Sequence, residues 1–429
     1  MHRHSATYAI TSAEVKEIKE RMLNWSKQFG ILLFLDSNNY GQLHSSYECL
    51  LAVGSAGNWN EDGDTLDQLK LLHETNKDWI FGHLCYDYKN RLEPKLISGH
   101  EERIGFSLSH FFIPQTVCHI DASKTVLTIE SFDDPAVVYK AINETPPAPE
   151  ENIPSLRFTS VTGKDRYLDT ISQLRSHIAE GDCYEINYCN EGFCRDALVE
   201  PLPVFKALNV LSPAPFAAYY RCGDKYMMCA SPERYLRKKG NNILSQPIKG
   251  TARRDADPAK DTLIKEQLKE DIKERAENVM IVDLVRNDLA RCCETGSVTV
   301  EELFGIYTFP QVHQMVSTVT GNLRPDIPFT DALRYSFPMG SMTGAPKYKV
   351  MQLIDKYEHS RRELYSGTVG YISPDGDFDF NVVIRSLFYN EGAKYLSYQT
   401  GGAITYDSDP EKEWDEMRLK AWALERIFG

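Results

Sequence analysis

The sequence predicts an α+β protein, because segments that favour helices and segments that favour strands alternate along the chain. Residues 12–28 predict a helix, and residues 411–428 predict another with apolar side chains at helical spacing. Residues 30–36 form a short apolar run, and residues 124–130 alternate between apolar and polar side chains, so both predict strands. With 429 residues, 42% of them hydrophobic, the chain can bury a large core.

Three further helices are expected in the second half of the chain. Residues 164–180 predict a helix that stops at a glycine. Residues 261–291 predict one long helix with an apolar stripe that runs through Ile272 and Val279. A helix is also predicted to begin at Pro346, because proline suits the first helical turn.

A proline-rich stretch at residues 146–155 predicts an extended linker. It separates an N-terminal segment, residues 1–145, from residues 156–429, where most of the chemically informative motifs lie. The linker need not separate two independent domains. The sequence therefore leaves open whether the two parts fold separately or together.

Charge and composition exclude several classes of function. The formal net charge is −13 and there is no basic tract, which argues against a nucleic-acid partner. The apolar runs are too short to span a membrane, and the N-terminus has no apolar leader. The ten cysteines include no C-x-x-C pair, so we expect reduced thiols in a cytoplasmic protein.

Lys249 lies in the unusual setting Pro-Ile-Lys-Gly-Thr, residues 247–251, at the end of a predicted buried strand. A partly buried lysine beside other cations can lose its proton and act as an amine nucleophile. The alternative is a lysine whose stem packs on the strand edge while its charge reaches solvent. The pentapeptide by itself does not decide between them.

Acidic residues on the last predicted helix indicate a metal site or a solvated face. Glu413, Glu416 and Lys420 recur at i, i+3 and i+7, so they share one side of the helix. Carboxylates that retain some water suit the octahedral preference of Mg²⁺. An exposed acidic face without any ion is the alternative interpretation.

Four motifs in order resemble those of the chorismate-utilising enzymes, which include anthranilate, aminodeoxychorismate, isochorismate and salicylate synthases. They are Ser-Pro-Glu at 231–233, Pro-Ile-Lys-Gly-Thr at 247–251, Gly-Ser-Met-Thr-Gly-Ala-Pro-Lys at 340–347 and Asp-Ser-Asp-Pro at 407–410. The likeness runs from about residue 167 to the end of the chain. It implies two large, mostly antiparallel sheets packed together with helices outside, and one composite domain that includes the N-terminal strands.

The resemblance also implies a set of site residues. The catalytic residues would be Lys249, Glu233 and His313. The substrate would contact Gly250, Thr251, Thr343, Tyr365, Arg385, Gly401, Gly402 and Lys420, and Mg²⁺ would be held by Glu277, Glu413 and Glu416. A lone histidine on a strand can equally be structural, and Glu233 can equally pair with Arg234 or Arg237. Because chorismate is a dianion, a divalent cation would remove its repulsion by the three carboxylates.

Lys249 distinguishes the branches of the family that this chain resembles. Anthranilate synthases have alanine there, whereas aminodeoxychorismate synthases have lysine, as here. Isochorismate and salicylate synthases use a lysine on an earlier strand, where this chain has Glu185 and most ammonia-using relatives have glutamine. The implied activity is a transferase reaction, the amination of chorismate at C4 through a covalent Lys249 adduct. It gives 4-amino-4-deoxychorismate for para-aminobenzoate and folate synthesis.

Two alternatives remain open at this point: an anthranilate synthase component I, and a non-catalytic scaffold subunit of a glutaminase. No cysteine lies in a G-x-C-x-G glutaminase motif, so ammonia is expected from a separate glutaminase subunit. Ser37, together with Pro215, Phe216 and Ala217, resembles the lining of a tryptophan pocket in relatives. Whether tryptophan binds here is left undecided by the sequence.

Overall fold

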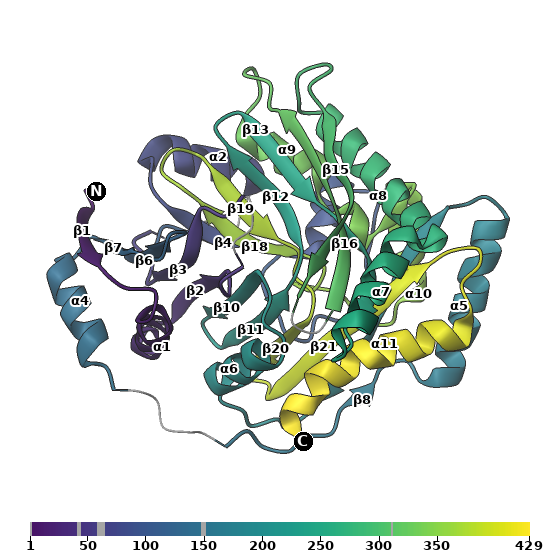
Figure 1. Ribbon diagram of the computed structural model, residues 1–429, viewed down its shortest axis with the longest axis horizontal. Coiled ribbons are helices and arrows are strands. Elements are labelled where there is room, and N and C mark those ends of the chain that lie inside the picture. The colour runs from purple at the N-terminus through teal and green to yellow at the C-terminus, as the bar shows by residue number, and fades with distance from the viewer. Residues whose placement is uncertain (1, 41–43, 58–64, 147–151, 310–311) are drawn as a thin grey trace.

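The computed structural model describes residues 2–40, 44–57, 65–146, 152–309 and 312–429 (Figure 1). Two antiparallel sheets of 12 and 9 strands form its centre, as the resemblance implied. The first sheet runs β1 (His4–Ala9), β7 (Val126–Ser131), β6 (Thr116–Asp121), β3 (Tyr47–Val53), β2 (Ile31–Asp36), β10 (Phe216–Cys222), β11 (Lys225–Ser231), β20 (Ser386–Asn390), β21 (Tyr395–Ile404), β9 (Glu185–Cys194) and β17 (Gly344–Ala345), with β8 (Thr159–Ser160) on β9.

The second sheet carries the strand of the Pro-Ile-Lys-Gly-Thr motif at one end. It runs β14 (Ile248–Arg253), β16 (Val312–Asn322), β13 (Asn242–Gln246), β12 (Arg234–Lys239), β19 (Phe378–Asn381), β18 (Thr368–Ile372), β4 (Ile80–Leu84) and β5 (Ser109–Phe112), with β15 (Thr299–Thr308) on β16. Strand β14 therefore lies at the sheet margin, where its residues can face a cavity rather than a second neighbour.

Helices surround the sheets. They are α1 (Val15–Ser26), α2 (Thr65–Asn76), α3 (Lys89–Leu92), α4 (Pro135–Glu144), α5 (Lys164–Ala179), α6 (Pro201–Leu211), α7 (Pro258–Glu270), α8 (Ile272–Ala290), α9 (Phe329–Ser336), α10 (Lys347–Tyr357) and α11 (Pro410–Glu425). Figure 1 shows α1 and α4 beside the N-terminal strands, and α5, α7, α8 and α11 on the opposite side of the molecule. None of the helices in the described ranges is long and apolar enough to cross a membrane.

Strands from the N-terminal segment are built into both sheets. Strand β2 pairs with β10, where Leu35 lies opposite Ala218, and β4 pairs with β18, where Gly82 lies opposite Gly370. These pairings join residues before and after the predicted linker into one hydrogen-bonded body. Residues 147–151 of that linker lie outside the described residues.

The first sheet is buried on both faces, which explains its long apolar strands. In β2, Leu33 packs into the core between the two sheets, whereas Leu32 and Phe34 point to a second core beneath the outer helices. Successive side chains of a strand face opposite sides, so a continuous apolar run is what a doubly covered strand requires. The run predicted as a strand at residues 30–36 is β2 itself.

The long helix predicted over 261–291 is in fact two helices. Asp271 has an extended backbone, ends α7 and caps α8 by accepting a hydrogen bond from Glu274 N at 3.0 Å. The break shifts the helical phase, so the predicted stripe is wrong: Ile272 is 86% exposed and Val279 is 42% exposed. The buried face of α8 instead carries Ile281 and Val285, among others. Asp271 is a residue type that favours helix N-caps, so it could have indicated the break, but the apolar periodicity continued across it.

Candidate active site

A cavity of about 930 Å³ opens between β14, the start of α8, the end of β21 and α11. This volume is typical of a site for a small organic ligand. Most of the predicted site residues line it: Glu233, Lys249, Gly250, Thr251, Glu277, Tyr365, Arg385, Gly401, Gly402, Glu413, Glu416 and Lys420. Segments that lie far apart in the chain thus meet around one space.

Two predicted residues do not line this cavity. His313 is buried on β16, where its ring lies 3.0 Å from both Asp261 Oδ1 and Thr308 Oγ1. Its neighbours Val312 and Gln314 face the cavity, so strand alternation turns His313 the other way. The Thr343 hydroxyl is also turned inward and donates to the Met339 carbonyl at 3.1 Å. The catalytic role predicted for His313 does not fit this position.

Lys249 extends from β14 into the cavity wall, and its ammonium donates to Glu185 Oε1 at 2.5 Å. The side chains are 9% and 1% exposed, so the ion pair is buried. Burial opposes the charge on Lys249, but the nearby carboxylates of Glu185 and Glu277 outweigh it and raise the lysine pKa. In the ligand-free protein the neighbours of Lys249 are thus carboxylates, which favour its charged form.

Glu233 lies directly after β11 and is 4% exposed. Burial raises the pKa of its carboxyl to about 7, although the charges of Lys249 and Arg385 act in the opposite direction. The alternative ion pair with Arg234 is not formed, because that guanidinium binds Asp379 at 2.9 Å. Glu233 can therefore carry a proton near neutral pH, as a general acid must.

Arg385 gives the cavity an unneutralised positive charge. It lies just before β20 with a positive φ of 51°. Among the described residues its guanidinium forms no hydrogen bond or ion pair, and Glu233 is the one opposing charge that acts on it. Tyr365 lines the same cavity. A partly buried cation without a protein partner indicates an anionic ligand.

Several buried polar atoms along the cavity also lack partners. Within the described ranges, Glu277 Oε1, Gln314 Oε1 and Thr400 Oγ1 form no hydrogen bond, and all three residues line the cavity. Buried polar groups in native proteins are almost always satisfied, so each such atom requires an explanation. A polar ligand with several acceptors and donors would satisfy them together.

Four carboxylates from two helices converge on one side of the cavity. Glu274 and Glu277 lie one turn apart on α8, and Glu413 and Glu416 have the same spacing on α11. Burial raises the pKa of Glu277 to about 7, and burial also raises the pKa of Glu413. The charge of Lys420, 2.8 Å away, lowers the pKa of Glu416.

Glycines allow the backbone to come close to these carboxylates. A Cβ at residue 402 would lie 3.1 Å from Glu413 Oε2 and 3.7 Å from Glu416 Oε1, and one at residue 250 would lie 3.2 Å from Glu274 Oε2. Glu274 was missed in the sequence analysis. The signal was present, because Glu274 and Glu277 repeat the i, i+3 spacing that was noticed only in the last helix.

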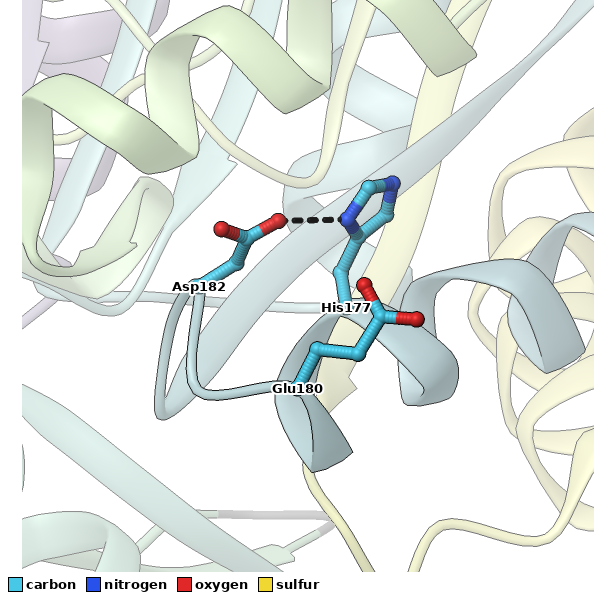
Figure 2. Close-up of side chains that lie close together, drawn as sticks. All are labelled: His177, Glu180 and Asp182. Carbon is cyan, nitrogen blue, oxygen red and sulfur yellow. Dashed lines mark hydrogen bonds and ion pairs between the residues drawn. The ribbon is translucent and has the colours of Figure 1, made fainter.

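The acidic side chains fit a hard divalent cation in chemical type. All are oxygen donors, and in the described part of the chain Glu277 Oε1 is buried without a hydrogen bond. They are not drawn into a compact cluster. In the described residues, only His177, Glu180 and Asp182 place three ligand atoms within 4.8 Å of one another (Figure 2).

The His177 group lies away from the cavity and has protein partners. The His177 ring forms hydrogen bonds through Nδ1 to Asp182 Oδ2 at 2.7 Å and through Nε2 to the Tyr357 hydroxyl at 2.9 Å. Lys349 Nζ lies 3.1 Å from Asp182 Oδ1. Figure 2 shows the Asp182 carboxylate directed at the ring, with Glu180 on the adjoining turn. A lysine beside the aspartate supplies the positive charge that a metal would supply, so this group is explained as a structural one.

The residues predicted for a tryptophan pocket do come together. Ser37, Pro215, Phe216 and Ala217 surround a second cavity of about 60 Å³. This space holds a few water molecules and is too small for an indole ring unless it widens. Tryptophan binding therefore stays a prediction.

Comparison with known proteins identifies the family of this chain. The family of chorismate binding enzymes matches residues 35–426. An aminodeoxychorismate synthase from Streptomyces griseus is 44% identical over 266 residues, which are 62% of this chain and 36% of that protein. Aminodeoxychorismate synthase component 1 from Klebsiella aerogenes is 37% identical over 298 residues, 69% of this chain and 65% of that protein. The chain thus spans only part of the length of these relatives.

A solved structure has the same fold throughout. The crystal structure of anthranilate synthase component I from Streptococcus pneumoniae aligns with a TM-score of 0.78 and 26% identity, over 90% of this chain and 93% of that one. A menaquinone-specific isochorismate synthase from Escherichia coli also aligns with a TM-score of 0.78, at 18% identity over 100% of this chain and 95% of that one. The second likeness concerns the fold alone.

Proposed function

The chain belongs to the chorismate binding enzymes, and from this premise we propose that it aminates chorismate at C4 to give 4-amino-4-deoxychorismate. The observation that carries the proposal is the meeting of Lys249, Glu233 and the unpartnered Arg385 on one cavity. The relatives of this chain include aminodeoxychorismate synthases, at 44% and 37% identity. The product would enter para-aminobenzoate and folate synthesis.

Arg385 and Tyr365 would receive a carboxylate of the substrate. The guanidinium can form two parallel hydrogen bonds to one carboxylate, which fixes both position and orientation. Gly401, beside them on the cavity, allows β21 to pair closely with β9, because a Cβ there would lie 2.1 Å from the Tyr188 carbonyl oxygen. These contacts would hold the ring with its reacting carbons toward Lys249 and Glu233.

Lys249 would act as the nucleophile and Glu233 as the general acid. Neutral Lys249 attacks C2 and forms a C2–N bond, both ring double bonds shift, and the C4–O bond breaks while Glu233 protonates the departing hydroxyl to water. Ammonia then forms a bond to C4, both double bonds shift back, and the C2–N bond breaks, which returns the electron pair to the Lys249 amine. The proton that the added nitrogen loses restores the Glu233 carboxyl. Chorismate and ammonia are thereby converted into aminodeoxychorismate and water.

Glu277 and Glu416 would hold a magnesium ion, with Glu413 and Glu274 beside them. When bound, the ion would neutralise these carboxylates and a carboxylate of the substrate. Lys273 and Lys420 already compensate part of this negative charge, at 3.7 Å from Glu277 and 2.8 Å from Glu416.

Ammonia would be delivered by a separate glutaminase subunit. The sequence offers no nucleophilic cysteine in a G-x-C-x-G setting, and free ammonium should replace the partner in the test tube. Anthranilate synthase component I remains the rival activity, because a solved structure with that activity shares the fold. A non-catalytic scaffold would have no need of a proton-carrying Glu233 beside a buried lysine.

The test is to supply the purified chain with chorismate, Mg²⁺ and ammonium at mildly alkaline pH and to identify the product by mass and retention. Aminodeoxychorismate as the main product is expected, and Lys249→Ala serves as the matched control. If anthranilate is the main product, the chain has the activity of an anthranilate synthase component I instead. Absence of turnover, combined with stimulation of an added glutaminase, would support the scaffold instead.

A further inference from the structure

Glu185 is buried behind Lys249 and has no role in the reaction proposed above. It does not line the cavity, and its side chain is 1% exposed. Its Oε1 accepts the 2.5 Å hydrogen bond from Lys249, while Oε2 has no partner among the described residues. Lys249 therefore spans the wall of the cavity, with Glu185 on the protein side and the ligand space on the other.

The Gly340–Met342 turn and the residues after it fix the backbone that carries Glu185. Strand β17 pairs with β9 so that Ala345 lies opposite Glu185, and Tyr184 N donates to Ala345 O at 2.8 Å. Gly344 has a φ of +139°, and a Cβ on it would lie 2.1 Å from the Glu185 carbonyl oxygen. Only glycine permits this close approach. The conspicuous Gly-Ser-Met-Thr-Gly-Ala-Pro-Lys motif thus determines where Glu185 sits.

Four other carboxylates act on Lys249, but none replaces this contact. Glu274 and Glu277 on α8, Glu233 after β11 and Glu416 on α11 all lie near enough for their charges to interact with the lysine. Among the described residues, Lys249 Nζ donates a hydrogen bond only to Glu185. The contact that holds the end of the flexible lysine side chain in one place therefore comes from β9.

We propose that Glu185 is the positioning residue of Lys249, holding its nitrogen by a direct hydrogen bond from outside the cavity so that it meets the reacting ring carbon. The inference rests on the function proposed above. Under this proposal the activity depends on the position of the acceptor oxygen, which the length of the side chain sets, and not on its charge. Displacement of a reacting group by about 1 Å can cost on the order of 10²-fold in rate.

Two substitutions of Glu185 separate the effect of side-chain length from the effect of charge. Glu185→Gln keeps an acceptor oxygen at the same distance and removes the charge, whereas Glu185→Asp keeps the charge and withdraws the oxygen by one bond, about 1.5 Å. We expect kcat of Glu185→Gln to fall by no more than about threefold, and kcat of Glu185→Asp to fall by about 10- to 100-fold with KM within about twofold. Such a split marks an effect on the reacting geometry rather than on substrate binding.

Glu191→Asp is the matched control, because Glu191 is a buried glutamate on the same strand that pairs with Arg103 at 2.7 Å, away from the cavity. It should retain wild-type kcat. The proposal is overturned if Glu185→Asp turns over like the wild type, or if Glu185→Gln loses as much kcat as Glu185→Asp. Melting temperatures of all three variants identify any loss that is due to unfolding.

Carbamylation of Lys249 by cyanate tests the contact without any turnover. The extent is measured by mass spectrometry of the peptide that contains Lys249, in wild type and in each variant. Glu185→Gln should react about tenfold faster or more, because the charge that holds the proton on the amine is lost, and Glu191→Asp should not. Equal rates in all proteins would overturn the anchoring. If the chain forms no aminodeoxychorismate, the proposed function fails while this measurement still judges the anchoring.

Discussion

Two buried lysines in this chain have similar surroundings and opposite consequences. Lys19 on α1 donates to Asp36 at 2.6 Å and to Glu48 at 2.5 Å, beside the small second cavity. Lys249 donates to Glu185 at 2.5 Å and lines the large cavity. Although burial opposes their charge, neighbouring carboxylates raise the pKa of both lysines. A carboxylate beside a buried lysine is therefore not what identifies a reactive site.

The difference lies in which groups around each lysine are left unsatisfied. Around Lys19 both carboxylates are engaged, and Ser37 also donates to Glu48 at 2.8 Å. Around Lys249, within the described residues, the Arg385 guanidinium and the Glu277 Oε1 atom form no hydrogen bond to the protein. Complete pairing suits a structural ion network, whereas incomplete pairing indicates a place for a ligand.

Replacement of the two lysines should separate these roles most strongly. Lys249→Ala should reduce kcat for amination by about 10³-fold or more, because the nucleophile is lost. Lys19→Met should leave kcat of the folded protein intact and destabilise it by about 3–5 kcal/mol, because two buried carboxylates lose their partner. Steady-state rates and thermal unfolding of both variants measure this. Wild-type kcat in Lys249→Ala would end the nucleophile assignment.

The proton on Glu233 should govern the alkaline side of the pH profile. With a pKa of about 7, the acid is present below that pH and is lost above it, so kcat/KM at constant un-ionised ammonia should fall as pH rises. Glu233→Gln should lose about 10²- to 10⁴-fold in kcat. The assignment of Glu233 as the general acid would be contradicted if kcat/KM fell only far from neutral pH and if the pH of this fall were the same in Glu233→Asp.

The same carboxyl should affect stability with a defined sign. Its pKa in the folded protein is raised from the ordinary 4.5 to about 7, so the folded state holds the proton more tightly. The stability it contributes is fully present below about pH 4.5 and is lost as pH rises through 7. Glu233→Gln removes this loss and should melt at a higher temperature than the wild type at pH 8.

Removal of single carboxylates should weaken the response to magnesium. Glu277→Gln and Glu416→Gln should each raise the Mg²⁺ concentration for half-maximal activity by about 10- to 100-fold, because each removes one charge from a site for a hard cation. Titration of activity with Mg²⁺ after treatment with a chelator measures the shift. A wild-type response in both variants would place the ion elsewhere.

The smallest effect is expected at the glycine beside those carboxylates. Gly402→Ala places a methyl group 3.1 Å from Glu413 Oε2 and 3.7 Å from Glu416 Oε1, so the carboxylates must shift by a few tenths of an ångström. We expect a two- to fivefold loss of apparent Mg²⁺ affinity, roughly, with little change in melting temperature. Gly401→Ala is the contrasting variant, because its Cβ would lie 2.1 Å from the Tyr188 carbonyl oxygen and should prevent correct folding.

The sequence predicted helices and strands correctly where their formation depends on residues close together in the chain. The helix predicted over 164–180 is α5, Lys164–Ala179, and the strand predicted over 124–130 is β7, Val126–Ser131. The spacing of Glu413 and Glu416 on one helical face was also predictable. The sequence did not show that His313 lies outside the cavity lining, because a motif identifies a residue but not the side of the strand that it faces, and one position along β16 reverses that side.

The sequence by itself determined the chemical groups available to this protein: a lysine in Pro-Ile-Lys-Gly-Thr, a glutamate in Ser-Pro-Glu and acidic residues at helical spacing. The tertiary structure alone decided which charges meet, since Glu185 and Lys249 are 64 residues apart. Burial and Coulomb interactions depend on distance through space and on access to water, and neither can be deduced from the order of residues in the chain. That is why the lysine was predicted as a site residue, while the carboxylate that holds it, and the direction of its pKa shift, became known only from the fold.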